Sequence, residues 1–131
     1  VLLVCCADLS TYAKNTRKRL EELVEAGVFS DDYIAFYPNA DGPKDAEALK
    51  GYKPHAMLNV AIAGEHIALR AVSLGLGTCF VQLMRAREIS QILDLPEDLI
   101  VTCLMPVGFP DQKPAMRPRL KLEDIIYKVV D

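Results

Sequence analysis

No run of apolar residues in this chain reaches about 18 residues, the length that a membrane-spanning helix needs. The first residue is Val1 rather than Met, and no signal-peptide pattern follows it. The formal net charge is only −3, which excludes a general electrostatic attraction to nucleic acid or to anionic membranes. We therefore expect a globular protein with neither a nucleic-acid partner nor a membrane partner.

Familiar catalytic motifs are also missing. The sequence contains no Gly-x-Ser-x-Gly, no His-Glu-x-x-His and no Cys-x-x-Cys. Its cysteines, at Cys5, Cys6, Cys79 and Cys103, have neither metal-type nor redox-type spacing. They are typical of buried free thiols in a reducing cytoplasm. We predict a cytoplasmic protein and assign no catalytic side chain and no metal ligand.

The 131 residues, 51% of them apolar and 25% charged, are typical of one globular domain spanning 1–131. The chain opens on Val1–Ala7, an apolar run that predicts a buried strand. A buried strand with nothing before it leads us to expect that upstream sequence is missing. After Asp8, cap candidates predict a helix that runs to about Ala26 and stops at Gly27.

Residues 28–56 combine turn and breaker signals, Lys53-Pro54 among them, with most of the aromatic residues. The pattern predicts an irregular excursion with at most short helices, and it places His55 in a loop. Long irregular segments in compact domains are often functional. Two interpretations stay open: a lid over a pocket, or aromatic side chains that anchor a loop to the surface.

The segment from Met57 to Leu74 predicts a long helix that is apolar over most of its circumference. One narrow polar stripe runs along it, formed by Asn59, His66, Arg70 and Ser73. Such a helix must be covered nearly all round, and a chain of this length rarely supplies enough cover. We therefore expect a second copy of the protein to pack against it. For His66, an interface or core position is favoured over a catalytic role.

Gly75 and Gly77 follow this helix. They do not form a dinucleotide-binding fingerprint, which joins a strand to a following helix and has a third glycine. Gly75 instead predicts a helix cap and Gly77 a close backbone approach. A short strand at Thr78–Val81, a helix near Arg85–Leu93 and a buried strand at Leu99–Val107 are expected next. Since Pro106 cannot donate a hydrogen bond, that strand end is expected at a sheet edge or a bulge.

Arg117 and Arg119 flank Pro118 in a proline-rich segment near the C-terminus. Planar guanidinium groups suit the oxygens of a phosphate, although a surface pair of this kind is also typical of simple solvation. The tail then places apolar residues at helical spacing, namely Leu122, Ile125, Ile126 and Val129.

Taken in order, these pieces resemble the nitroreductase family of flavin enzymes. The resemblance rests on the opening strand with Asp8, the helix ending in Leu74-Gly75-Leu76-Gly77-Thr78-Cys79-Phe80, the Leu95-Pro96 turn, Val107-Gly108-Phe109-Pro110, and Arg117-x-Arg119 before Leu122–Ile126. It covers nearly the whole chain, and the helix with its glycines is the most specific piece.

The resemblance implies an α+β fold, a mixed and mostly antiparallel sheet flanked by helices, in an intertwined homodimer. It implies that 1–131 is the C-terminal two-thirds of such a fold. The family binds FMN at the dimer interface and passes a hydride from NAD(P)H through the flavin to a small oxidised acceptor, nitroaromatic or quinone-like. By position, Phe80, Val81 and Gln82 would lie along the flavin ring, and Arg117 and Arg119 would hold the FMN phosphate.

Two departures keep an alternative open. The family's N-terminal arginine-containing segment has no match here, and Gln82 stands where relatives commonly have Gly or an acidic residue. The alternative is a non-catalytic, nitroreductase-like dimeric remnant or binding module with an incomplete flavin site. A small α/β module unrelated to flavin is a third possibility. Neither the acceptor nor a preference between NADH and NADPH can be read from the sequence.

Overall fold

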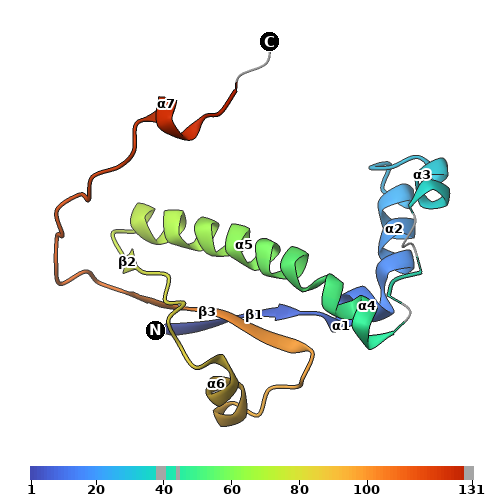
Figure 1. Ribbon diagram of the computed structural model, residues 1–131, viewed down its shortest axis with the longest axis horizontal. Coiled ribbons are helices and arrows are strands. Elements are labelled where there is room, and N and C mark those ends of the chain that lie inside the picture. The colour runs from blue at the N-terminus through green and yellow to red at the C-terminus, as the bar shows by residue number, and fades with distance from the viewer. Residues whose placement is uncertain (38–40, 44, 129–131) are drawn as a thin grey trace.

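The computed structural model describes residues 1–37, 41–43 and 45–128. A small antiparallel sheet lies at its centre in the order β1-β3-β2, and helices lie on both of its faces (Figure 1). The elements are β1 (Leu2–Asp8), α1 (Ser10–Lys14), α2 (Thr16–Glu25), α3 (Asp31–Phe36), α4 (Ala46–Gly51), α5 (Lys53–Ser73), β2 (Gly77–Thr78), α6 (Ala86–Ile92), β3 (Leu99–Gly108) and α7 (Leu122–Ile125). The α+β prediction with an antiparallel sheet is confirmed.

Strand β3 lies between its two partners and is the most buried element. Val101, Cys103 and Met105 are buried, and so is the intervening Thr102. Because successive side chains point to opposite faces, this strand is covered on both sides. Helix α5 packs on one face and α6 on the other (Figure 1). The buried strand predicted at Leu99–Val107 is therefore confirmed.

The prediction that Pro106 lies at an edge or a bulge is wrong, because β3 is the central strand. Val107 donates to the carbonyl oxygen of Val1 at 2.8 Å, and Leu104 donates to that of Val81 at 3.0 Å on the opposite side. Amide donors alternate sides along a strand, so the missing donor of Pro106 faces the β2 side. Pairing on that side is interrupted between Thr78 and Val81. No ladder hydrogen bond is therefore required from Pro106.

The single helix expected after Asp8 is in fact two helices that break at Asn15. Asn15 has φ −127° and ψ 5°, outside the helical region. Leu20 is buried on the inner face of α2. Gly27 follows with a φ of 70°, as a residue just past a helix end commonly has. The predicted stop is confirmed.

The excursion at 28–56 contains two short helices, α3 and α4. The ring of Tyr33 stacks on Phe29 with centroids 4.2 Å apart and on Tyr37 at 6.1 Å. These rings stack on one another along α3, within the excursion itself, so the aromatic-anchor interpretation stays a prediction. Whether the segment also acts as a lid stays a prediction.

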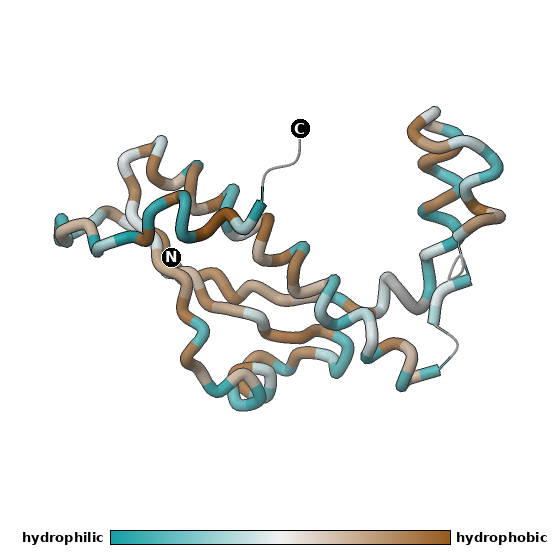
Figure 2. Tube along the Cα trace, turned by 45° about the horizontal axis from the view of Figure 1, so that its top comes forward, coloured by the Kyte–Doolittle hydropathy of each residue, from teal (hydrophilic) through white to brown (hydrophobic). Residues whose placement is uncertain are grey.

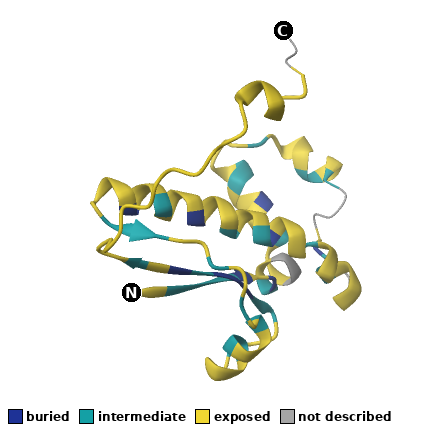
Figure 3. Ribbon diagram, turned by 60° about the vertical axis from the view of Figure 1, so that its left-hand side comes forward, coloured by how far each residue is buried: buried dark blue, intermediate teal, exposed yellow. Residues whose placement is uncertain are grey.

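Helix α5 begins at Lys53, four residues earlier than expected. Only Ala56, Gly64 and Ala71 are buried, and they form a line that faces the sheet, whereas most of the helix is exposed (Figure 3). Apolar residues continue around much of its length (Figure 2). Its exposed large apolar side chains are Leu58, Ile62, Ile67, Leu69 and Val72. The prediction that this chain alone does not cover the helix is confirmed within the described residues.

The total exposed surface leads to the same conclusion. The chain exposes 10786 Å², whereas a compact monomer of 14.5 kDa would expose about 6,900 Å². Part of the excess comes from the C-terminal tail, which leaves β3 and extends away from the body (Figure 1). Its helix α7 is one turn long, and Leu122, Ile125 and Ile126 are exposed. Val129, the fourth residue of that predicted pattern, lies outside the described residues.

Candidate functional site

The break after α5 fixes the start of the candidate site. Gly75 has a φ of 74°. Its amide donates to Val72 O at 3.0 Å, and the next amide, of Leu76, donates to Ala71 O at 2.9 Å. These two hydrogen bonds form a Schellman cap. A Cβ on Gly77 would lie 3.3 Å from the Cβ of Pro110, so both glycine predictions are confirmed.

The segment Phe80–Gln82 forms an edge next to β3. Val81 exchanges two backbone hydrogen bonds with Leu104, at 2.9 and 3.0 Å. The amides of Phe80 and Gln82 therefore point away from β3. Within the described residues neither amide donates to another group. Gln82 is exposed, and Phe80 is 40% exposed. The structure thus leaves the backbone donors of Phe80 and Gln82 free along an open sheet edge, whereas the amide of Val81 is paired with β3.

Thr78 adds a second unpaired group nearby. Its hydroxyl oxygen is buried and has no hydrogen-bond partner in the part of the chain that the structure describes. Buried polar atoms are nearly always paired, so this hydroxyl is an unsatisfied group beside the segment Phe80–Gln82. Sequence reasoning did not single it out, because an unpaired atom becomes visible only when the packing is known.

Arg117 and Arg119 are both exposed in the irregular segment that follows β3. Neither forms a hydrogen bond or an ion pair with any described residue. That segment runs away from the body of the molecule (Figure 1), and the structure does not bring the arginines against Phe80–Gln82. The predicted phosphate role is untested by this arrangement.

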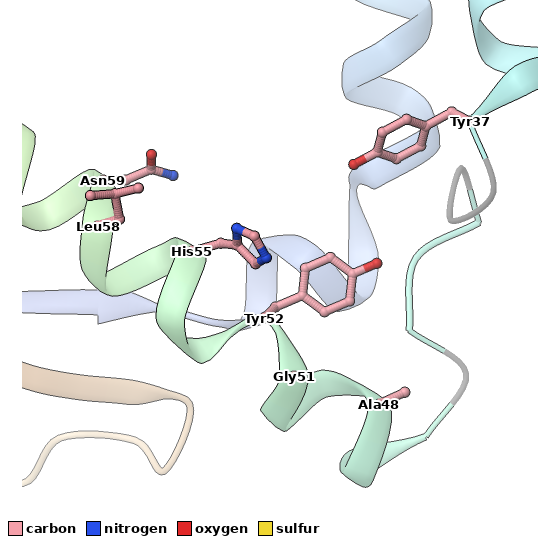
Figure 4. Close-up of a pocket in the computed structure, with 7 residues that line it drawn as sticks. All are labelled: Tyr37, Ala48, Gly51, Tyr52, His55, Leu58 and Asn59. Carbon is pink, nitrogen blue, oxygen red and sulfur yellow. The ribbon is translucent and has the colours of Figure 1, made fainter. Parts of the chain in front are cut away.

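A separate cavity of about 440 Å³ lies at the start of α5. Tyr37, Tyr52, His55 and Asn59 are among its lining residues (Figure 4). His55 was expected in a loop but lies in the first turn of α5, because Pro54 occupies a helix start, where its missing amide costs nothing. Sequence reasoning interpreted this proline as a helix breaker and so missed the cavity.

His66 lies on the outer part of α5 and is exposed. It lines a mostly apolar hollow of about 500 Å³ together with Ile67, Leu74 and Val1. The core position suggested for His66 is therefore wrong, and the interface position stays a prediction.

Two of the four thiols, those of Cys6 and Cys103, have surroundings that disfavour a nucleophile. Burial, with a contribution from Cys5, raises the pKa of the Cys103 thiol to about 11. Burial and Cys5 also raise the pKa of Cys6. All four cysteines are free, as expected, but Cys79 is exposed rather than buried. A raised pKa disfavours the thiolate, which is the reactive form.

The described residues contain no cluster of three or more His, Cys, Asp or Glu side chains that could hold a metal ion. None of the described helices is long and apolar enough to span a membrane.

Comparison with known proteins shows which family this chain is similar to. Residues 45–109 match the model of the Nitroreductase family. An NADPH-flavin oxidoreductase of Vibrio harveyi is 33% identical over 69 residues, which are 51% of this chain and 29% of that protein. An NADPH-dependent oxidoreductase of Staphylococcus haemolyticus is 35% identical over 77 residues, 56% of this chain and 31% of that protein. The chain thus spans about a third of these relatives.

Among solved structures, a Staphylococcus epidermidis protein assigned as an NAD(P)H:FMN oxidoreductase superposes with a TM-score of 0.74. The match covers 98% of this chain and 61% of that one, at 16% identity. At this level of identity the superposition establishes the fold alone.

Proposed function

Because the chain is similar to the nitroreductase family, we propose that it forms part of an FMN-dependent oxidoreductase. Electrons pass from NAD(P)H to a small oxidised acceptor of the nitroaromatic or quinone type. FMN, when bound, supplies the hydride chemistry. The residues of this chain bind and orient it, and none of them is assigned a catalytic role.

The open edge at Phe80–Gln82 is the observation that carries this proposal. The free amides of Phe80 and Gln82 are donors, and a flavin ring presents acceptors along one edge. An edge strand with unpaired donors suits such a ring better than a side chain does, because its geometry is fixed by the pairing of Val81 with Leu104. The exposed face of Phe80 offers a flat apolar surface beside these donors.

Arg117 and Arg119 are proposed to hold the FMN phosphate. Both are free of intrachain partners among the described residues, so no existing ion pair has to break when a phosphate binds. Because they lie in an extended segment outside the body of the chain, assembly with a second copy is expected to complete the site.

The proposed assembly is an intertwined homodimer whose core includes α5. The exposed surface exceeds that of a compact monomer by about 3,900 Å², far more than the roughly 800 Å² that each partner contributes to a standard interface. We further propose that residues 1–131 form one domain, corresponding to the C-terminal two-thirds of the fold. The free thiols favour a cytoplasmic location.

Titration with FMN tests the proposal directly. The purified full chain is expected to quench FMN fluorescence at stoichiometric amounts, and the bound flavin is expected to bleach when NADH or NADPH is added without oxygen. Replacing both arginines with alanine should weaken FMN binding about tenfold or more. Lys113→Ala is the matched control, since Lys113 is an exposed cation in the same segment. A protein that leaves FMN fluorescence unchanged contradicts the proposal.

The second candidate is a non-catalytic dimeric relative that has lost its flavin site. This candidate predicts a dimer by sedimentation that neither binds FMN nor oxidises NAD(P)H.

A further inference from the structure

Gly64 lies near the middle of α5, with ordinary helical residues on both sides. Glycine is the least favourable helix residue after proline, because it loses the most backbone freedom on folding. The other two buried positions on this helix face are alanines, at 56 and 71. Of these three buried positions, only position 64 lacks a Cβ. The expected reason for a glycine there is that another group lies close to the helix backbone.

The structure provides that reason. A Cβ built on Gly64 would lie 2.7 Å from Cε1 of Phe80 and 3.1 Å from its Cζ. It would also lie 3.4 Å from the sulfur of Met105. Atoms in real structures do not approach a Cβ as closely as 2.7 Å, so an alanine here must displace the ring. Met105 is fully buried and closes the space on the sheet side.

The ring of Phe80 therefore packs with its Cε1–Cζ edge against the backbone of α5 at Gly64, while the residue as a whole stays 40% exposed. The same segment is held to β3 by the hydrogen bonds of Val81. Together, the ring contact and the strand pairing fix the free amides of Phe80 and Gln82 in direction. We propose that Gly64 is a positioning residue for the flavin-binding segment: it seats the Phe80 ring and thereby places Phe80–Gln82 against FMN. This inference rests on the proposed function for its ligand.

Two other glycines show that the contact is particular to Gly64. A Cβ on Gly51, at the end of α4, would meet nothing within 4 Å, and the same holds for Gly108. Neither has a positive φ. Gly51→Ala is therefore the matched control for Gly64→Ala, because it makes the same chemical change in a helix without a steric consequence.

The first test needs no flavin. Amide hydrogen exchange is measured by mass spectrometry on peptides covering residues 78–84, in the full chain and its variants. Gly64→Ala is expected to speed exchange of this segment about tenfold relative to Gly51→Ala. Phe80→Leu lacks the two ring atoms that meet the new Cβ, so adding Gly64→Ala to Phe80→Leu should produce less than about a threefold further change. Equal exchange in Gly64→Ala and Gly51→Ala overturns the positioning role.

The second test uses FMN itself and follows quenching of its fluorescence. Gly64→Ala is expected to raise the dissociation constant about tenfold, while Gly51→Ala stays within about twofold of the original chain. In the Phe80→Leu background the Gly64 substitution should again have little further effect. If Gly64→Ala and Gly51→Ala bind FMN equally well, the role of Gly64 toward the flavin is overturned.

The two tests fail in different ways. If the original chain binds no FMN, the proposed function fails, while the exchange measurement still decides whether Gly64 seats Phe80. If Gly64→Ala does not fold by circular dichroism, the Gly64→Ala/Phe80→Leu double variant should fold, because the clash is gone. Failure of the double variant to fold overturns the assignment of Phe80 as the group that Gly64 accommodates.

Discussion

Asp8 is the last residue of β1, and its carboxylate accepts hydrogen bonds from the first residues of α1. Its Oδ1 accepts from the backbone amide of Ser10 at 2.8 Å and from the Ser10 hydroxyl at 2.7 Å. Its Oδ2 accepts from the Thr11 hydroxyl at 3.3 Å. The Ser10 hydrogen bond lowers the pKa of Asp8 below its ordinary value of 3.8, with smaller contributions from the amide and Thr11. A single side chain therefore accepts from one backbone amide and two hydroxyls at the start of α1.

Replacing Ser10 with alanine is expected to raise the pKa of Asp8 toward 3.8, because the first and largest stabilisation of the carboxylate is lost. The lowered pKa means that ionised Asp8 stabilises the folded chain above pH 3.8, and that this contribution is lost as the pH falls through the folded pKa. The variant should therefore lose less stability between neutral and acid pH. NMR titration of Asp8 measures the shift.

Ser10→Thr retains the hydroxyl and serves as the control. An unchanged Asp8 pKa in Ser10→Ala would contradict this account. Since Asp8 is exposed, the effect on stability is expected to be small.

At the scale of a single element, α6 ends on an unusual residue. Asp94 has a φ of 50°, and among the described residues no other non-glycine has a positive φ. Its amide donates to Gln91 O at 3.3 Å, and the amide of Leu95 donates to Ser90 O at 2.9 Å. This is the position that glycine usually occupies after a helix. An L-residue there carries a steric cost that glycine avoids.

Asp94→Gly is expected to stabilise the folded chain by about 1 kcal/mol, because glycine adopts this conformation without strain. Denaturant unfolding measures the difference. Asp111→Gly, in an exposed segment without a positive φ, is the control and should not stabilise. A destabilised Asp94→Gly variant would show that the greater freedom of glycine in the unfolded chain outweighs the strain.

The elements that the sequence predicted well are those whose own residues decide them. The strand at Leu99–Val107 and the helix ending at Gly75 follow from apolar pattern and cap chemistry. The wrong predictions concern residue types that can occupy more than one kind of position in a helix or a sheet. Pro54 was interpreted as a breaker but starts α5, and Asn15 gave no sign that the first helix divides. Pro106 was assigned to an edge, although an interrupted neighbour accommodates it in a central strand.

At the scale of the whole molecule, the outer face of α5 is the largest unexplained feature. Val72 is 69% exposed although it lies on the longest and most apolar helix. Val72→Glu would have little effect on a lone chain, since exposed substitutions usually change stability by less than about 0.5 kcal/mol. In the proposed dimer the same change buries an unpaired charge.

We therefore expect Val72→Glu to convert the dimer to monomer, as measured by sedimentation velocity. Ile92→Glu is the matched control, because Ile92 is 80% exposed on α6, a helix outside the proposed interface. A Val72→Glu protein that sediments like the original chain would show that α5 is not the dimer core.

The candidate site was predictable in part. Phe80, Val81 and Gln82 follow from a family resemblance carried by the preceding glycines, and the structure gives them an open edge. Gly64 and Thr78 could not be assigned a role in advance, because both depend on which side chain or empty space lies next to them. The arginines are recognisable by type, but in the proposed dimer their location depends on the second chain.

The register of the sheet also has a consequence for synthesis. The amide of Val107 donates to the carbonyl oxygen of Val1 at 2.8 Å, so β1 pairs with a strand that lies far along the sequence. On the ribosome, β1 therefore emerges long before the strand that pairs with it, and it stays unpaired until nearly all of this chain has been made. Such non-local pairing slows folding and leaves an apolar strand open to unwanted contacts. A nascent chain with this topology is expected to bind chaperones until β3 has been synthesised.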